Sequence, residues 1–259
     1  MNIDESWLRQ GHFVLGGTRP SFTQVVREKL CDALGLPKKD FGIHPYPGRG
    51  PIHTIYWRKV KSPYREAQFY AHIADCHAVL SLGVSVEKGY EAGKWAKGAE
   101  RMGRRDPWDW RRLVKQIPTL LKTEIPIVAK ELRDVRLGGA ALSSDLSFQL
   151  YALPPDRGDE ESEELCESRI FSMVDGDWFE RGARGVKPED IEAAVAEFDE
   201  RKEWWVEVHF AKDLSLAEAA RLDVEAVVSI LKTFNEIRTQ LRGEAQCRAG
   251  VAEERRKHE

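Results

Sequence analysis

Three consecutive segments of the chain have the composition of short β-strands, and this pattern constrains the fold more than any other feature. They span 53–60, 67–74 and 77–86, and each is rich in β-branched or aromatic residues. Only short polar breaks separate them. Strands joined by such short connections pair with their neighbours in an antiparallel meander. The sequence therefore predicts an antiparallel sheet in this region.

Helical patterns lie on both sides of these strands. A first helix is expected from Phe22, with Ser21 as the N-cap and Gly35 as the C-cap. Residues 109–133 are mainly helical in pattern, although Pro118 and Pro126 should kink or divide that helix. Together with the strands, these helices predict an α+β fold in which helices cover an antiparallel sheet.

The second half of the chain also mixes strands and helices. Segments 135–142 and 146–153 are expected to form a hairpin, and 169–174 and 203–210 are expected to be strands. A helix is predicted over 188–200. The sequence Ser215-Leu-Ala-Glu is a capping box that opens a further helical region, which continues to residue 241.

Composition suggests a division into two lobes. Residues 154–167 contain seven acids and one arginine among Pro, Gly and Ser, which is typical of a linker. We therefore predict a basic α+β domain over 1–153, a smaller α/β lobe over 168–243, and a charged tail over 244–259.

The two halves of the chain also differ in charge. Residues 1–133 carry 23 Lys and Arg against 14 Asp and Glu, a net charge of +9, whereas residues 134–259 carry 17 against 29, a net charge of −12. The first half could therefore face a polyanion, while the second half meets solvent or a basic partner. Mutual attraction of the two halves is the alternative explanation.

The sequence favours a cytoplasmic protein with no membrane contact. It has no basic and apolar leader at its N-terminus and no apolar run of about 18 residues. Its four cysteines are widely scattered, which is typical of a reducing compartment. The hydrophobic fraction of 42% is that of a chain able to fold around its own core.

The strongest functional signal is a basic stretch that also contains tryptophan. It carries a net charge of +5 and comprises Lys94, Trp95, Lys97, Arg101, Arg104, Arg105, Trp108, Trp110, Arg111, Arg112 and Lys115. Lysine and arginine neutralise phosphates, and exposed tryptophan stacks on bases. This stretch therefore predicts contact with DNA or RNA. The alternative is a solvated basic face whose tryptophans anchor the following helix in the core.

Two weaker patterns suggest metal chemistry. His44, His53, Cys76 and His77, with Asp40 or Asp75, could supply zinc ligands or a general base if the sheet brings them together. A nuclease that places Glu and Lys two residues apart on one strand face has no good match, because Glu87 and Lys88 are adjacent. We predict no metal site and no cofactor.

Signature motifs of nucleotide-binding, serine-hydrolase, zinc-protease and kinase families are missing from the sequence. The segment 67–90 resembles the modified-DNA-reading domains fused to restriction GTPases of the McrB type, over 24 residues that include no diagnostic motif, so no residue roles are carried over. The expected function is that of a non-catalytic accessory protein, of bacterial type, that contacts nucleic acid. A protein-interaction or regulatory subunit and a metal-dependent hydrolase or nuclease remain the alternatives.

Overall fold

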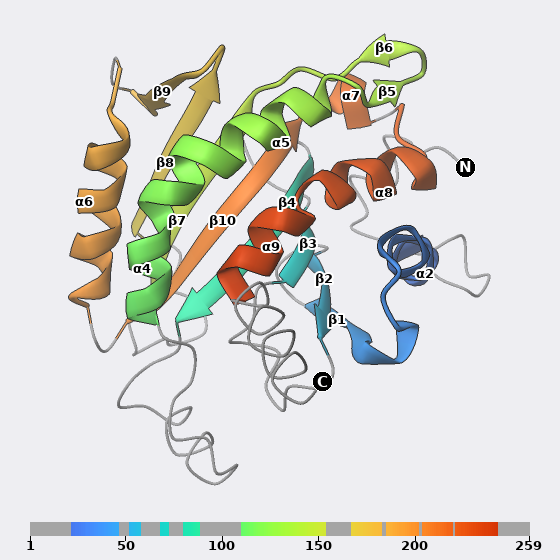
Figure 1. Cartoon of the computed structure of the whole chain (residues 1–259), viewed down its shortest axis with the longest axis horizontal. Helices are drawn as coiled ribbons and strands as arrows, with labels where there is room; N and C mark the ends of the chain where they lie inside the picture. Colours follow the sequence, from blue (N-terminus) through green and yellow to red (C-terminus); the bar gives the residue numbers. More distant parts are fainter. Residues whose placement is uncertain are drawn as a thin grey trace, which may run out of the picture.

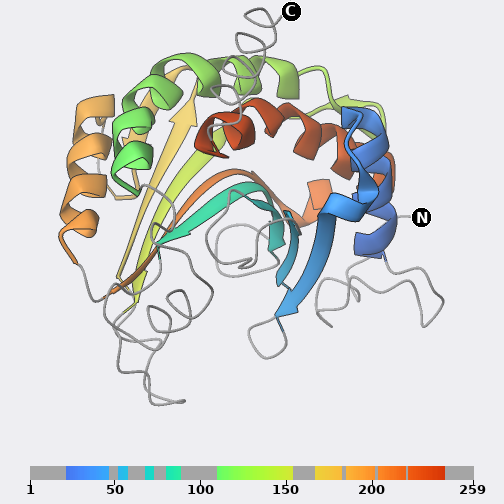
Figure 2. The same cartoon turned by 60° about the horizontal axis from the view of Figure 1, so that its bottom comes forward.

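The computed structural model describes residues 22–46, 52–57, 68–72, 80–88, 110–153, 167–182, 185–201, 204–219 and 221–242. The described chain is an α+β protein, as predicted: helices cover one face of an antiparallel sheet (Figure 1). The sheet is arched, and the helices lie over its convex side (Figure 2). Its other side is the concave face.

Eight strands form the main sheet, and every recorded neighbour pair is antiparallel. The order is β1-β2-β3-β4-β10-β7-β8-β9. The strands are β1 (Phe41–Tyr46), β2 (Ile52–Trp57), β3 (Gln68–His72), β4 (Leu80–Lys88), β7 (Leu146–Leu153), β8 (Glu167–Val174), β9 (Asp177–Glu180) and β10 (Trp205–Leu214). The predicted meander corresponds to β2, β3 and β4 and is confirmed.

Strand β10 is the last in sequence but lies in the middle of the sheet, between β4 and β7. Strands from both sides of the predicted linker therefore share one sheet. The linker lies outside the described residues except for its last residue, Glu167, which begins β8. The predicted tail, 244–259, also lies outside them.

The helices follow the predicted regions but are more divided near the C-terminus. They are α2 (Phe22–Leu34), η1 (Lys38–Asp40), α4 (Trp110–Thr119), the π-helical segment η3 (Leu120–Glu124), α5 (Ile125–Leu132), α6 (Pro188–Asp199), α7 (Leu216–Ala219), α8 (Val224–Thr233) and α9 (Asn235–Arg242). Within the described parts of the chain, no helix is long and apolar enough to cross a membrane.

Local capping explains several of these boundaries. Gly35 adopts a left-handed φ of 64° and ends α2, as predicted. The Ser215 Oγ accepts a hydrogen bond from the Glu218 backbone N–H at 3.3 Å, while a Glu218 carboxylate oxygen accepts from the Ser215 N–H at 2.9 Å. This confirms the predicted capping box. Asp223 then caps α8 by accepting from the Ala226 N–H at 2.8 Å, which restarts the helix.

Helix α4, the π-helical segment and α5 follow one another without a break from Trp110 to Leu132. Pro118 lies near the end of α4 and Pro126 near the start of α5, and the π-helical segment between them separates the two α-helices, in keeping with the predicted kink or division. Pro126 has no N–H to donate to the carbonyl four residues earlier, and the wider π turn immediately before α5 accommodates that loss.

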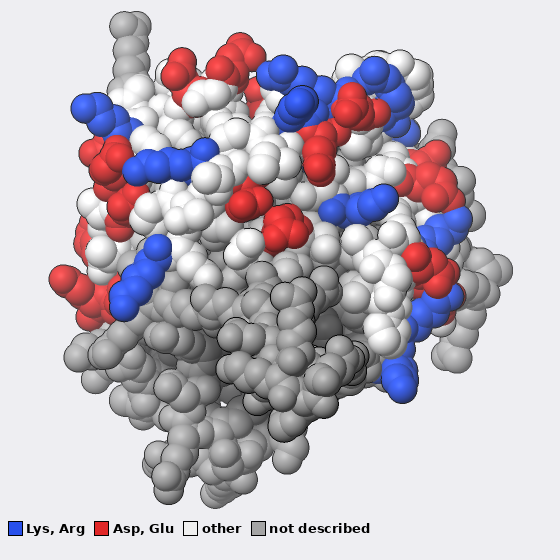
Figure 3. All heavy atoms as spheres, in the orientation of Figure 1, with Lys and Arg blue, Asp and Glu red and all other residues white. Residues whose placement is uncertain are grey.

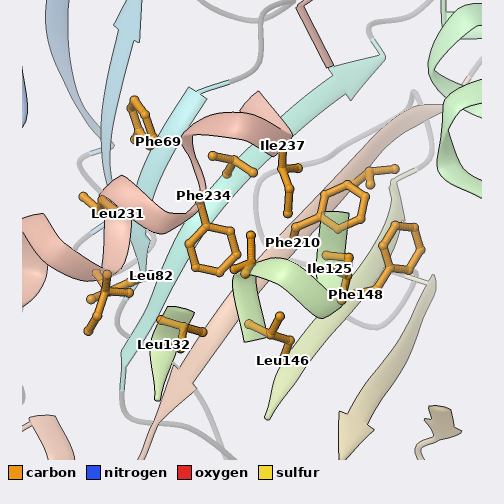
Figure 4. Packing of buried hydrophobic residues seen from close by; sticks show 14 of the residues in the cluster. Phe69, Leu82, Ile125, Leu132, Leu146, Phe148, Phe210, Leu231, Phe234 and Ile237 are labelled. Carbon is orange, nitrogen blue, oxygen red and sulfur yellow. The ribbon is translucent and has the colours of Figure 1, made fainter. Parts of the chain in front are cut away.

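Apolar side chains fill the space between the sheet and its helices. Phe210 of β10 and Phe148 of β7 pack edge to face with their ring centroids 4.9 Å apart, and both are fully buried. Helices α5, α8 and α9 cover them with buried side chains that include Ile125, Leu231 and Ile237 (Figure 4). Burial of each such side chain stabilises the fold by about 1.5–3 kcal/mol.

Two sequence predictions about strands are wrong. Segment 135–142 does not pair with 146–153; instead β5 (Arg136–Leu137) and β6 (Ala140–Ala141) pair with each other. Gly138 and Gly139 both have positive φ, which allows this tighter hairpin. Segment 37–52, whose four prolines and three glycines predict a loop without long regular structure, contains β1 with Pro45. Because β1 lies at the edge of the sheet, a residue without an N–H is tolerated there.

Candidate functional site

The predicted basic stretch is described only where it enters α4. Trp110, Arg111 and Arg112 form the first turn of this helix, and Lys115 is exposed in the next turn. The other members of the stretch lie outside the described residues: Lys94, Trp95, Lys97, Arg101, Arg104, Arg105 and Trp108.

The first turn of α4 is basic. It contains two arginines and no acid. In contrast, α6 begins with Glu189 and Asp190 in its first turn, and α8 carries Glu225 there. Acids at this end of a helix interact favourably with the macrodipole, whereas cations oppose it by about 0.3–1 kcal/mol each. A bound anion would relieve this repulsion.

The helix-covered side of the molecule does not show a comparable concentration of positive charge. In the described part of that side, lysines and arginines are interspersed with acids (Figure 3). Lys122 of the π-helical segment, for example, donates to Glu189 of α6 at 2.9 Å. This ion pair raises the pKa of Lys122 and lowers that of Glu189.

A hydrogen-bonded polar network lies on the concave face of the sheet. The Gln149 amide nitrogen on β7 donates to Ser147 Oγ at 2.9 Å and to a carboxylate oxygen of Asp213 on β10 at 3.2 Å. Tyr151 donates its hydroxyl to the Gln149 amide oxygen at 2.8 Å, and Ser81 of β4 donates to Asp213. Gln149 and Ser147 are only 7% and 3% exposed. The network thus joins three central strands with satisfied polar groups.

His209 and Glu207 extend this network along β10. A His209 ring nitrogen, Nε2, lies 3.1 Å from a Glu207 carboxylate oxygen, and the imidazole packs edge-on against the Tyr151 ring at 5.2 Å. The strand register places His209 between Ser85 of β4 and Gln149 of β7. A carboxylate that orients an imidazole is the arrangement used in general acid–base catalysis.

Lys212 is a buried cation at the end of β10. It is 3% exposed, and its ammonium donates to Ser143 Oγ at 2.6 Å and to the Asp145 backbone carbonyl at 3.1 Å. Burial lowers the pKa of Lys212, while the negative charges of Glu218, Asp145 and Asp213 act in the opposite direction. Ser143 is exposed in the turn that precedes β7.

The alternative metal sites can be followed only in part. The register pairs His44 with Thr54 and His53 with Pro45. Paired positions share a face of the sheet and successive positions alternate, so positions 44 and 53 lie on opposite faces. Cys76 and His77 lie outside the described residues. Among the residues that the structure describes, no group of three or more metal-ligating side chains is found.

Sequence reasoning missed the residues of the concave face, although a signal for them was present. Ser147, Gln149 and Tyr151 alternate with buried apolar residues in β7, as Glu207 and His209 do in β10. Once both segments are recognised as strands, each set falls on one face. The proximity of Ser143 to Lys212 had no such signal, because they are 69 residues apart.

The fold and these sites define an α+β protein with a helix-covered antiparallel sheet and a polar concave face. Comparison with known proteins adds no family to this description: no family model, no curated protein and no solved structure matches the chain.

Proposed function

We propose that this protein is an accessory protein that contacts nucleic acid through the basic stretch from Lys94 to Lys115. The observation that carries the proposal is the basic, acid-free first turn of α4, which ends a stretch whose eight cations outnumber its three acids. Phosphates at this end of the helix would be stabilised by the backbone N–H groups, the macrodipole and the arginines together.

A nucleic acid accounts for the composition of the stretch better than a small anion does. Eight cations and three tryptophans occur within 22 residues, with a net charge of +5. A polyphosphate backbone uses many cations at once, and unpaired bases can stack on tryptophan, at about 1–3 kcal/mol per base.

The competing proposal, a protein-interaction subunit that docks through the helical region 222–241, receives less support. The apolar side chains of this region are already buried against the chain's own sheet, among them Leu231, Phe234 and Ile237. A helix whose apolar face is filled in this way has little apolar surface to offer a partner.

The test is a salt titration of binding to short single- and double-stranded DNA and RNA. A variant with Arg104, Arg105, Arg111 and Arg112 changed to alanine should lose at least tenfold in affinity at low salt. If all four contact phosphates, the slope of log affinity against log salt should become shallower by up to about 3–4 on duplex DNA.

A matched control removes the same charge elsewhere. Lys39, Lys130, Arg221 and Lys232 are exposed and lie away from the basic stretch in sequence, so their combined change to alanine should leave affinity and slope nearly unchanged. Equal losses in both variants would indicate a nonspecific charge effect, and absence of wild-type binding at low salt would refute the proposal. Comparison of the four nucleic acids identifies the preferred form.

A further inference from the structure

The turn before β7 places an exposed hydroxyl against a buried amine. Lys212 Nζ lies 2.6 Å from Ser143 Oγ, and its second acceptor is the Asp145 backbone carbonyl. The lysine is 3% exposed, whereas Ser143 is open to solvent. A reacting molecule could therefore approach the hydroxyl from solvent while the amine stays behind it.

The surroundings of Lys212 differ from those of an ordinary structural lysine. Its recorded hydrogen bonds in the described part of the chain go to a hydroxyl and a backbone carbonyl, not to a carboxylate. Burial therefore lowers its pKa despite the nearby charges of Glu218 on α7, Asp145 in the turn and Asp213 on β10. A lysine in such a site more readily becomes a neutral amine, which can accept a proton.

We propose that Ser143 and Lys212 form a nucleophile–base pair that reacts with carboxylic esters. This arrangement matches the requirements of covalent catalysis by serine: a hydroxyl within hydrogen-bond reach of a base, with the base held by a further group. Here the further group is the Asp145 carbonyl. The inference does not depend on nucleic-acid binding.

The reaction balances with these two side chains and water. Neutral Lys212 accepts the Ser143 proton as Oγ bonds to the ester carbonyl carbon, and the resulting ammonium returns that proton to the departing alcohol oxygen. The acyl group is then on Ser143. Water attacks this acyl-serine while Lys212 accepts the water proton, and the released Ser143 oxygen takes a proton back from Lys212. The products are the alcohol and the carboxylic acid.

The first experiment uses a fluorophosphonate probe on the full-length protein, with the modified residue located by peptide mass spectrometry. Wild type should carry the adduct on Ser143, and its labelling rate should rise with pH as Lys212 loses its proton. Ser143→Ala should abolish that adduct. Ser144→Ala is the matched control, because Ser144 lies in the same turn but accepts from Arg133 at 3.3 Å instead of from the lysine.

Two lysine variants separate chemistry from structure. Lys212→Met removes the base and should slow labelling by at least about 100-fold. Lys212→Arg keeps a cation that can bond to the turn but does not become neutral, so it should be equally slow; thermal unfolding verifies that each variant is folded. An adduct on another residue, an unlabelled wild type, or labelling of a folded Lys212 variant at the wild-type rate would overturn the proposal.

Discussion

The two faces of the central sheet contain residues of opposite character, although the same strands supply both. On the helix-covered face, β10 places Val206, Val208 and Phe210, all fully buried among apolar neighbours. On the concave face, the same strand places Glu207, His209 and Asp213. Strand alternation thus separates an apolar face that packs against the helices from a polar face that carries a hydrogen-bonded network.

The difference teaches where each face obtains its stability. The helix-covered face gains free energy from removing apolar surface from water, which is large and non-directional. The concave face gains it from hydrogen bonds, which contribute about 0.5–1.5 kcal/mol each and depend on every partner being in place. Substitutions on the helix-covered face should therefore lower the free energy of unfolding more. On the concave face, the loss should depend more on which hydrogen-bond partners remain in place.

The largest effect is expected from Phe210→Ala. Phe210 is fully buried and packs against Phe148 at 4.9 Å, so its removal leaves a cavity between the sheet and the helices. We expect a loss of about 3–5 kcal/mol in the free energy of unfolding, measured by urea denaturation. Phe179→Ala is the matched control, because Phe179 is 38% exposed. Similar losses in both variants would show that this face is not the main core.

A smaller loss is expected from Gln149→Leu on the concave face. Leucine has a similar size but leaves the Tyr151 hydroxyl and the Asp213 carboxylate without the amide that bonds to both. The free energy of unfolding should fall by about 1–3 kcal/mol. Gln240→Leu is the control, because its amide bonds to Glu236 at 3.0 Å in an exposed setting. A neutral Gln149→Leu variant would show that the network contributes nothing.

Much of the fold could be predicted from sequence, because local patterns specify it. The content of β-branched and aromatic residues identified β2 to β4, and the Ser215 capping box and Gly35 marked helix ends that the structure confirms. The position of β10 could not be predicted. Its neighbours β4 and β7 are distant in sequence, and its pairing is decided by packing of the whole sheet rather than by any short pattern.

The candidate sites also differ in whether local sequence patterns could reveal them. The basic stretch is contiguous, so composition alone reveals it. Two other contacts, Lys212–Ser143 and Gln149–Asp213, form only because β7 and β10 lie side by side. No local sequence motif encodes that pairing. Lys212 is also an exception to the separation of polar and apolar residues. Its position in β10 follows Val208 and Phe210 on the helix-covered face, where the other residues of this strand are apolar.

The smallest change in the free energy of unfolding at neutral pH is expected from Lys212→Met, which replaces the polar residue of β10 on the helix-covered face. Burial lowers the pKa of Lys212 in the folded protein, so the unfolded chain binds more protons than the folded one between that lowered pKa and the unfolded value of about 10.4. Stability therefore rises with pH in this interval. Lys212→Met should remove that rise. At low pH, the variant should therefore have a larger free energy of unfolding than wild type. Urea denaturation across a pH series measures both effects.

Lys122 provides the control of opposite sign. Its exposed ion pair with Glu189 raises the pKa of Lys122 in the folded protein. The contribution of this pair to stability is therefore fully present below the pKa of the unfolded chain, and it is lost as pH rises through the pKa of the folded state. Lys122→Met should therefore leave the rise caused by Lys212 in place. If Lys212→Met and Lys122→Met give the same pH dependence, Lys212 is charged in the folded state as readily as a surface lysine. The difference between the two variants thus measures how strongly the end of β10 excludes water from this amine.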